Sequence, residues 1–261
     1  MILRRRVAVA LAVCALAGCS TLVRVPAGPS PSAIDAQTAW ARVLQRFVDA
    51  RGEVDFAALA ADRGDLDAYL RYVADTPLSS VPDWAPRLVH MINAYNALSM
   101  FNVIDSGIPA SHAGWHKVDF FVLRKLQIGR QAMSLRAFEN DVIRPYTRDR
   151  GDPRIHFALN CSALSCPVLP REPFTAGVLQ EQLERETRAF FARPENFRID
   201  DAARTVWLSE LLDFYEEDFV PVPASSLLEY ANRYAPQAAP PNYAVRFTPY
   251  DWTIANSRRA R

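Results

Sequence analysis

Cys161, Cys166 and His156 stand close together in the sequence, and their side chains could carry out chemistry. Small residues follow Cys161 and allow one or two helical turns, which would place this cysteine near a helix start. Backbone amides at that position would stabilise a thiolate and so favour a nucleophile. The apolar and polar residues of 154–160 alternate, which predicts a short strand in which Cys161 lies about 16 Å from His156. A catalytic histidine would then have to reach Cys161 by another route through the fold.

Two other interpretations of the same cysteines remain open. In an exported protein the two would meet oxidising conditions, and their spacing, with Pro167 following, suits a Cys161–Cys166 disulfide. Metal binding together with His156 is the third interpretation, but the spacing matches no zinc signature. We therefore predict no bound metal and no cofactor.

Polar residues interrupt the apolar segment 86–105, which has the length and the end signals of a helix. His90, Asn93 and Asn96 are spaced three residues apart and spread over about 120° of a surface that is otherwise apolar. Such a helix should be buried, and buried amides need hydrogen-bond partners. The asparagines could fix the backbone of a neighbouring loop, or the three residues could form one wall of a binding pocket.

Glu139 lies on the apolar face of the helix expected after Ser134, four residues beyond Leu135. Its carboxylate should therefore point into the protein. It could pair with a histidine or an arginine, and Arg144 and Arg154 are near in the sequence. Alternatively, burial could raise its proton affinity and make it a candidate acid or base.

The N-terminal segment has the layout of a secretory signal peptide. Arginines at positions 4–6 precede an uncharged run over 7–17 that is too short to span a membrane. The sequence Leu16-Ala17-Gly18-Cys19 then resembles the bacterial lipobox, so we expect cleavage before Cys19 and lipidation of its sulfur. We predict a lipid-anchored protein of the cell envelope. Ser20 is typical of sorting to the outer membrane, with the body facing the periplasm.

The chain divides into four expected parts. They are a signal peptide (1–18), a flexible lipid-anchored linker (19–32), a globular domain (33–256) and a short basic tail (257–261). Without residues 1–18 the chain carries 27 basic and 29 acidic residues, which does not favour nucleic acid as a partner. The expected partners are the membrane, through the lipid, and an envelope protein or a small-molecule ligand.

Helical periodicity dominates the globular domain. Beyond the helix over 86–105, apolar residues repeat at helical spacing, or caps and stops mark a helix, in the segments 40–48, 66–73, 134–143, 175–192 and 209–219. Short apolar runs predict strands over 118–123, 126–133, 197–199 and 205–208. We therefore predict an α+β fold, a helix-rich single domain with a small antiparallel or mixed sheet.

Several motifs together resemble the domain of unknown function 547 (DUF547) family. They are Gly52-Glu53-Val54-Asp55-Phe56, the segments 92–98 and 152–161, Ser134-Leu135 with Phe138-Glu139, Ser165-Cys166-Pro167 and Tyr250-Asp251-Trp252. The resemblance implies one domain with signature positions at Asn93, Asn96, Glu139, Arg154, His156, Asn160 and Cys161. The family often has a histidine directly after the helix glutamate, where this chain has Asn140. The resemblance implies no particular substrate or cofactor.

Two functions fit these residues. In the first, the protein is a lipid-tethered binding or assembly domain whose candidate binding residues are Asn93, Asn96, Arg154, Asn160 and His90. In the alternative, it is a thiol-dependent envelope hydrolase or acyltransferase with Cys161 as nucleophile. His90 or His156 would then be the base, Glu139 would orient it, and asparagine amides would be the donors. We favour the binding domain, which agrees with a disulfide in an oxidising compartment.

Overall fold

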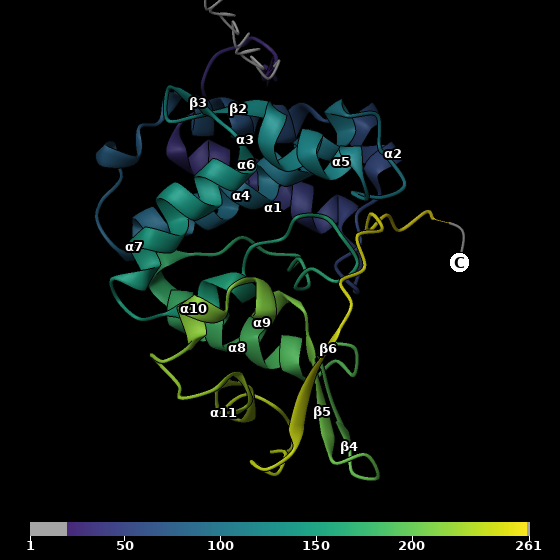
Figure 1. Cartoon of the computed structure of the whole chain (residues 1–261). Helices are drawn as coiled ribbons and strands as arrows, with labels where there is room; N and C mark the ends of the chain where they lie inside the picture. The colour runs from purple at the N-terminus through teal and green to yellow at the C-terminus, as the bar shows by residue number, and fades with distance from the viewer. Residues whose placement is uncertain (1–19, 260–261) are drawn as a thin grey trace, which may run out of the picture.

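The structure, a computed structural model of the chain, describes residues 20–259. It consists mainly of helices and contains two small three-stranded sheets (Figure 1). The α+β class predicted for a helix-rich domain is confirmed, with two sheets where one was expected. The expected signal peptide and Cys19 lie outside the described residues. None of the described helices is long and apolar enough to cross a membrane.

Four helices build the first half of the core. They are α1 (Ala33–Phe47), α2 (Phe56–Ala61), α3 (Gly64–Asp75) and α4 (Ala85–Asp105), with a short 3₁₀ turn η1 (Leu78–Ser80) before α4. Ser32 caps α1, because its hydroxyl accepts a hydrogen bond from the amide of Asp35. The predicted apolar stripes of α1 and α3 meet, and Trp40 stacks on Tyr69 with ring centroids 5.4 Å apart.

Helix α4 crosses the middle of this core. Every side chain from Leu88 to Val103 is buried, which confirms the prediction of a helix that is surrounded by protein. The helix ends at Asp105, just before the positive-φ Gly107. The polar side chains of α4 must therefore find partners inside the protein.

The first sheet ties the start of the described chain to the body. Strand β1 (Thr21–Leu22) pairs in parallel with β2 (Arg124–Ile128), which pairs antiparallel with β3 (Gln131–Met133). The single strand predicted over 126–133 is thus two strands, because the chain turns back at the positive-φ residues Gly129 and Arg130. Val23 is buried, and the amide of Val23 donates to the carbonyl oxygen of Lys125 (2.8 Å). Residues 21–23 of the linker predicted over 19–32 are therefore part of the folded body.

Two π-helical segments replace expected regular structure. Residues 118–123 were predicted as a strand, but they belong to α5 (Trp115–Val118) and the π-helical η2 (Asp119–Leu123). A short apolar run cannot distinguish a strand from a buried helical turn, and here the Phe120 carbonyl accepts a hydrogen bond from Asn102 of α4. The helix expected over 134–143 starts as α6 (Leu135–Ala137), capped by Ser134, and continues as the π-helical η3 (Phe138–Ile143) and α7 (Arg144–Arg148).

The strand predicted around His156 was also wrong. Residues Pro153–Phe157 form a 3₁₀ helix, η4, because Asp152 caps it and a proline occupies its first position. The residues after it form an irregular segment that contains both cysteines. The separation of about 16 Å along a strand therefore does not apply to His156 and Cys161.

The last third of the chain forms the second half of the molecule. It contains η5 (Ala176–Val178), α8 (Leu179–Phe191), β4 (Phe197–Asp200), β5 (Thr205–Ser209), α9 (Leu211–Phe214), α10 (Glu216–Phe219), α11 (Leu227–Asn232) and β6 (Ala244–Thr248). Strand β5 lies between an antiparallel β4 and a parallel β6. The helix expected over 209–219 is split into α9 and α10 at Tyr215.

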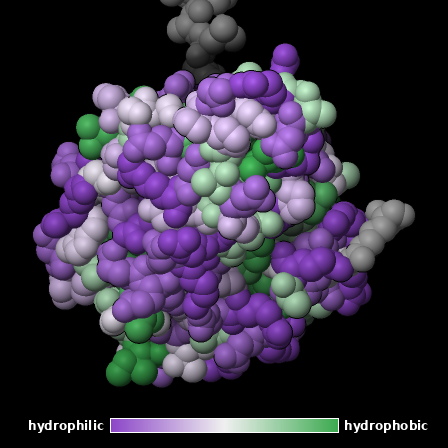
Figure 2. All heavy atoms as spheres, turned by 90° about the horizontal axis from the view of Figure 1, so that it is seen from below, coloured by the Kyte–Doolittle hydropathy of each residue, from purple (hydrophilic) through white to green (hydrophobic). Residues whose placement is uncertain are grey.

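Two clusters of buried apolar side chains result. One surrounds α4, and the other joins Phe157 of η4 to α8, α10 and α11. In Figure 1 the first cluster lies in the upper part of the molecule and the second in the lower part. The face seen from below in Figure 2 is mostly hydrophilic, with hydrophobic residues in small separate patches. The segment after η4 contributes Ala158 and Leu159 to the first cluster and both cysteines to the second, and Phe121 of η2 packs against both clusters. These segments therefore lie where the two halves meet.

Candidate functional site

An open groove and a small cavity adjoin each other between the two halves. The outer groove has a volume of about 860 Å³ and the inner cavity about 50 Å³. Five residues are common to the linings of both, and we call them the neck: Phe121, Glu139, Phe214, Tyr215 and Trp252. The two π-helical segments supply Phe121 and Glu139, in keeping with the frequent occurrence of such segments at functional sites.

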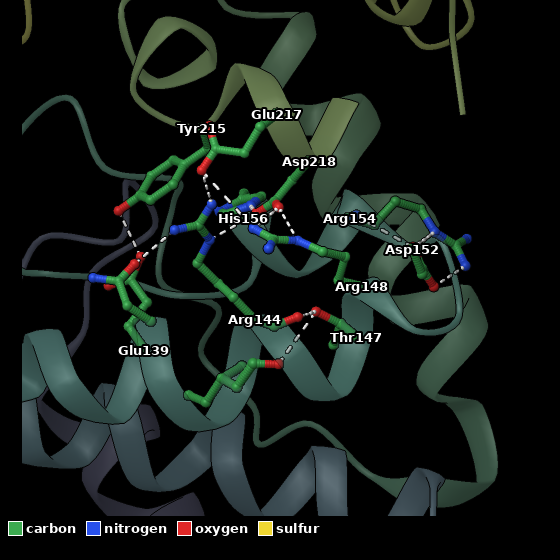
Figure 3. A network of polar contacts seen from close by, with 12 residues as sticks. Glu139, Arg144, Thr147, Arg148, Asp152, Arg154, His156, Tyr215, Glu217 and Asp218 are labelled. Carbon is green, nitrogen blue, oxygen red and sulfur yellow. Dashed lines mark hydrogen bonds and ion pairs between the residues drawn. The ribbon is translucent and has the colours of Figure 1, made fainter. Parts of the chain in front are cut away.

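Glu139 is held by two tyrosines. Its Oε2 accepts a hydrogen bond from the hydroxyl of Tyr95 (2.8 Å), and its Oε1 accepts one from Tyr215 (2.5 Å). Figure 3 shows Tyr215 and Glu139 pointing toward each other. The burial of both tyrosines and the nearby charge of Glu139 raise the pKa of each hydroxyl. Both tyrosines therefore remain protonated donors at neutral pH.

The ion pair expected for Glu139 was wrong. Arg144 binds Asp218 (Nε to Oδ2, 2.6 Å) and Glu217 instead, and Arg154 binds Asp152. Glu139 is only 7% exposed. Even so, no basic side chain among the described residues forms an ion pair with its carboxylate.

His156 and Asp218 form a second polar group beside the inner cavity. His156 Nε2 lies 2.9 Å from Asp218 Oδ2, and its ring stacks on Tyr215. Burial alone would raise the pKa of Asp218, but hydrogen bonds from His156, Arg144 and Arg148 outweigh it and hold this pKa well below its ordinary value. An ionised carboxylate can only accept, so His156 donates from Nε2. Figure 3 shows this network converging on Asp218.

The two cysteines line the inner cavity as a disulfide. Cys161 and Cys166 are bonded to each other, with their Cα atoms 6.2 Å apart. The hydroxyl of Tyr250 donates to Cys166 Sγ (3.1 Å), and His112 Nε2 donates to the Cys161 carbonyl oxygen (2.9 Å). In this state Cys161 has no thiolate to act as a nucleophile.

The asparagines of α4 bind loop backbone. Asn93 Nδ2 donates to the carbonyl oxygen of Phe174 (2.9 Å), and its Oδ1 accepts from the amide of the same residue (3.0 Å). Asn96 does the same for the cysteine segment, donating to Ala158 (3.0 Å) and accepting from the amide of Asn160 (2.8 Å). Neither asparagine lines the groove or the cavity. Their contacts match the first of the two alternatives, the fixing of neighbouring loops.

The remaining candidate binding residues also lie outside the groove and the inner cavity. Asn160 fixes the cysteine segment by donating to the carbonyl oxygen of Pro167 (2.7 Å). Arg154 is held by Asp152. His90 packs edge-on against Tyr72, and neither of its ring nitrogens has a partner within residues 20–259. Burial lowers the pKa of His90 to about 4, so it is neutral at pH 7.

Sequence reasoning missed most of the aromatic residues of the site, together with Lys117 and Asp218. Lys117 Nζ lies 3.6 Å from the centre of the Trp252 ring, beside the outer groove. Tyr95, Tyr250 and Trp252 stand within motifs quoted for the family resemblance, which was the available signal. Nothing in the local sequence marks Tyr215 or Asp218. Within residues 20–259, no group of three His, Cys, Asp or Glu side chains is placed to hold a metal ion.

The fold and the site together define an α+β domain with an aromatic-lined groove that ends at a disulfide. Comparison with known families adds one finding. Residues 85–191 match the model of a family described as protein of unknown function, DUF547, so this part of the chain is similar to that family. The matched part includes Tyr95, Glu139, His156 and both cysteines. No curated protein and no solved structure matches the chain.

Proposed function

We propose that the protein is a lipid-tethered binding domain of the bacterial cell envelope whose ligand lies in the outer groove. The observation that carries this proposal is an open groove of about 860 Å³ that shares the five neck residues with a small inner cavity. Clefts lined by aromatic rings with a few polar groups are typical ligand sites. The closed disulfide favours binding over thiol chemistry, because it leaves no nucleophile at Cys161.

A screen of small fragments tests the groove directly. Mature protein with ¹⁵N-labelled tryptophan gives one indole signal for each of its five tryptophans, and Trp252→Phe assigns the signal of the neck. Neutral, anionic and cationic fragments are added one at a time. The proposal expects some fragments to shift the Trp252 signal while that of the buried Trp40 stays in place. If no fragment shifts the Trp252 signal selectively, the groove is not a ligand site.

The tether is the second part of the proposal, and it rests on the lipobox-like residues 16–19. Strand β1 begins at Thr21. Two residues of chain, at most about 7 Å when extended, would therefore separate a lipidated Cys19 from the first sheet. We expect labelled palmitate and a membrane fraction for the natural chain, and loss of both for Cys19→Ala. A natural chain that is unlabelled and found in the soluble fraction would contradict the tether.

A thiol-dependent hydrolase or acyltransferase is the second candidate function. One observation favours it: His156, which is paired with Asp218, lines the same inner cavity as Cys161. A histidine oriented by a carboxylate next to a cysteine is the usual arrangement of base and nucleophile. Asp218, not Glu139, would then orient the histidine.

The enzyme candidate needs the disulfide to open, and this makes it testable. Reduced protein is offered acyl esters and amides, and Cys161→Ser is compared with Cys166→Ser. The enzyme candidate predicts turnover by the natural chain and Cys166→Ser but none by Cys161→Ser, with all three folded. The binding proposal predicts no thiol-dependent turnover in any of them.

A further inference from the structure

We infer that the neck takes up a positively charged primary amino group of the ligand. This inference rests on the proposed function, because it assigns chemistry to the ligand of the same groove. Three features of the structure carry it: the charge of Glu139, the rings around it, and the placing of the basic side chains.

Glu139 differs from the other buried acidic residues. Among residues 20–259, the acidic residues classed as buried are Glu53, Glu139 and Glu186. Glu53 pairs with Arg51 and Arg259, and Glu186 pairs with Arg185. Within the described part of the chain, the partners of the Glu139 carboxylate are the two tyrosine hydroxyls. Neutral donors stabilise a carboxylate but leave its negative charge in place, and a buried charge normally requires a partner of opposite sign.

Part of the hydrogen-bonding capacity of Glu139 is also unused. A carboxylate offers about four acceptor positions, and the tyrosines occupy two. Because Glu139 lines both the outer groove and the inner cavity, a ligand group in the neck can reach it. A primary ammonium group supplies the missing positive charge, and its N–H groups can donate to the unused acceptor positions.

The four other residues of the neck are aromatic. The rings of Phe121, Phe214, Tyr215 and Trp252 line the same opening, and their negative faces attract cations. Cations of the protein already lie near three of these rings. Lys117 Nζ lies 3.6 Å from the Trp252 ring centre and 5.7 Å from the Phe214 ring centre. The guanidinium of Arg144 lies 4.8 Å from the Tyr215 ring centre.

The basic side chains give the site a direction. Three basic side chains, Lys117, Arg136 and Arg144, line the outer groove but not the inner cavity, and they outnumber the one acidic residue placed in the same way, Asp141. Glu139 lines both. A ligand with its amino group in the neck and an acidic group in the outer groove would match this order of charges. The inner cavity of about 50 Å³ has room for the end of an aliphatic amine but not for a ring. Free amino acids, peptide N-termini and lysine side chains share this chemistry.

The test uses four probes of similar length: butylammonium, butanol, butyrate and 4-aminobutyrate. Binding to the mature natural chain is followed by the assigned indole signal of Trp252, in a buffer without amines. We expect butylammonium to bind about tenfold more tightly than butanol, 4-aminobutyrate to bind more tightly still, and butyrate to bind most weakly. Tetramethylammonium, which has a charge but no N–H, should bind more weakly than butylammonium.

Variants then locate the effect. Glu139→Gln should remove the preference for butylammonium over butanol, whereas the matched change Glu53→Gln, at a buried glutamate with arginine partners, should leave it intact. If butanol binds the natural chain as tightly as butylammonium, the inference is overturned while the ligand groove stands. That comparison needs no variant, so it holds even if Glu139→Gln fails to fold. If no probe shifts the Trp252 signal, the inference and the proposed groove fail together.

To separate the sources of the amine, a short peptide with a free N-terminus is compared with the same peptide after N-acetylation and with an acetylated peptide that contains lysine. Binding of the first alone identifies a peptide N-terminus, and binding of the third identifies a lysine side chain. Absence of both, with butylammonium bound, restricts the ligand to a smaller amine. Equal binding of a fully acetylated, lysine-free peptide would contradict the inference.

Discussion

The amides of Asn93 and Asn96 and the carboxylate of Glu139 are all buried polar groups, but they differ in their partners. Each asparagine is bound at both ends of its amide by the backbone of a loop. Glu139 is bound by neutral side chains and faces an open groove. The comparison separates polar groups that fix the protein's own loops from a carboxylate that lines the groove. Equal burial does not imply an equal role.

The two regions are also connected. Asn96 fixes the start of the cysteine segment, and Asn160 fixes its later part by binding Pro167. This segment places the disulfide at the inner cavity, opposite the π-helical segment that carries Glu139. The rigid frame on one side therefore determines the shape of the site on the other.

The largest effect is expected from breaking the frame. Asn96→Ala removes the hydrogen-bond partner of two buried backbone groups, the carbonyl oxygen of Ala158 and the amide of Asn160. Each buried group left without a partner costs about 1–3 kcal/mol, so the free energy of unfolding should fall by about 4 kcal/mol. Chemical denaturation measures this change. Glu139→Gln serves as the comparison and should lower the free energy of unfolding clearly less. If it lowers this free energy more than Asn96→Ala does, the distinction between structural asparagines and a groove carboxylate is wrong.

A second prediction concerns His90, a buried polar group without a partner among the described residues. Its pKa in the folded protein is about 4, below the ordinary value of about 6.5 for an unfolded chain. The unfolded state therefore takes up the proton first as the pH falls. The contribution of neutral His90 to the free energy of unfolding is fully present above about pH 6.5. It is lost as the pH falls from about 6.5 to 4, and the total loss is roughly 3 kcal/mol.

His90→Leu should therefore flatten the loss of stability in this pH range, because leucine does not titrate. Its stability at pH 7 should stay within about 1 kcal/mol of the natural chain, since an apolar side chain of similar size fits an apolar site. Thermal unfolding from pH 7 to 4 measures both quantities. A variant that follows the same pH curve as the natural chain would show that folding does not lower the pKa of His90.

The smallest effect is expected at the neck. Tyr215→Phe removes one hydrogen bond to Glu139 and keeps the ring, so it should lower the free energy of unfolding by about 1 kcal/mol. It should also weaken butylammonium binding less than Glu139→Gln does, because the charge remains. Unfolding and titration of the same preparations test this order. If Tyr215→Phe abolishes amine binding, the Tyr215 hydroxyl rather than the Glu139 carboxylate binds the amino group.

Much of the fold could be predicted because its signals are local. The burial of α4 followed from apolar residues on all its faces, and strand structure was correctly expected over 126–133, although the turn at Gly129 that divides it into β2 and β3 was missed. The strand predicted at 154–160 failed because Asp152 and Pro153 favour a helical start more strongly than alternation favours a strand. The π-helical turns were not predictable, since a few apolar residues do not determine the helix type.

The site was predicted only in part, for a physical reason. Glu139 was correctly expected to point inward, but its partners come from α4 and from Tyr215, far away in the chain. The same holds for His156, whose partner Asp218 follows 62 residues later. Such contacts depend on how the two halves pack. Periodicity and caps describe single elements and carry no information about that packing.

A closed disulfide lines the inner cavity, and the proposed binding function rests on this disulfide staying closed. The most direct measurement is the state of Cys161 and Cys166 in mature protein purified from the periplasm without reductant. Iodoacetamide is added at several pH values and the intact mass is recorded before and after reduction. The account predicts no alkylation at either cysteine until a reductant is added. Rapid alkylation of Cys161 below neutral pH would reveal a free thiol of depressed pKa and would contradict it.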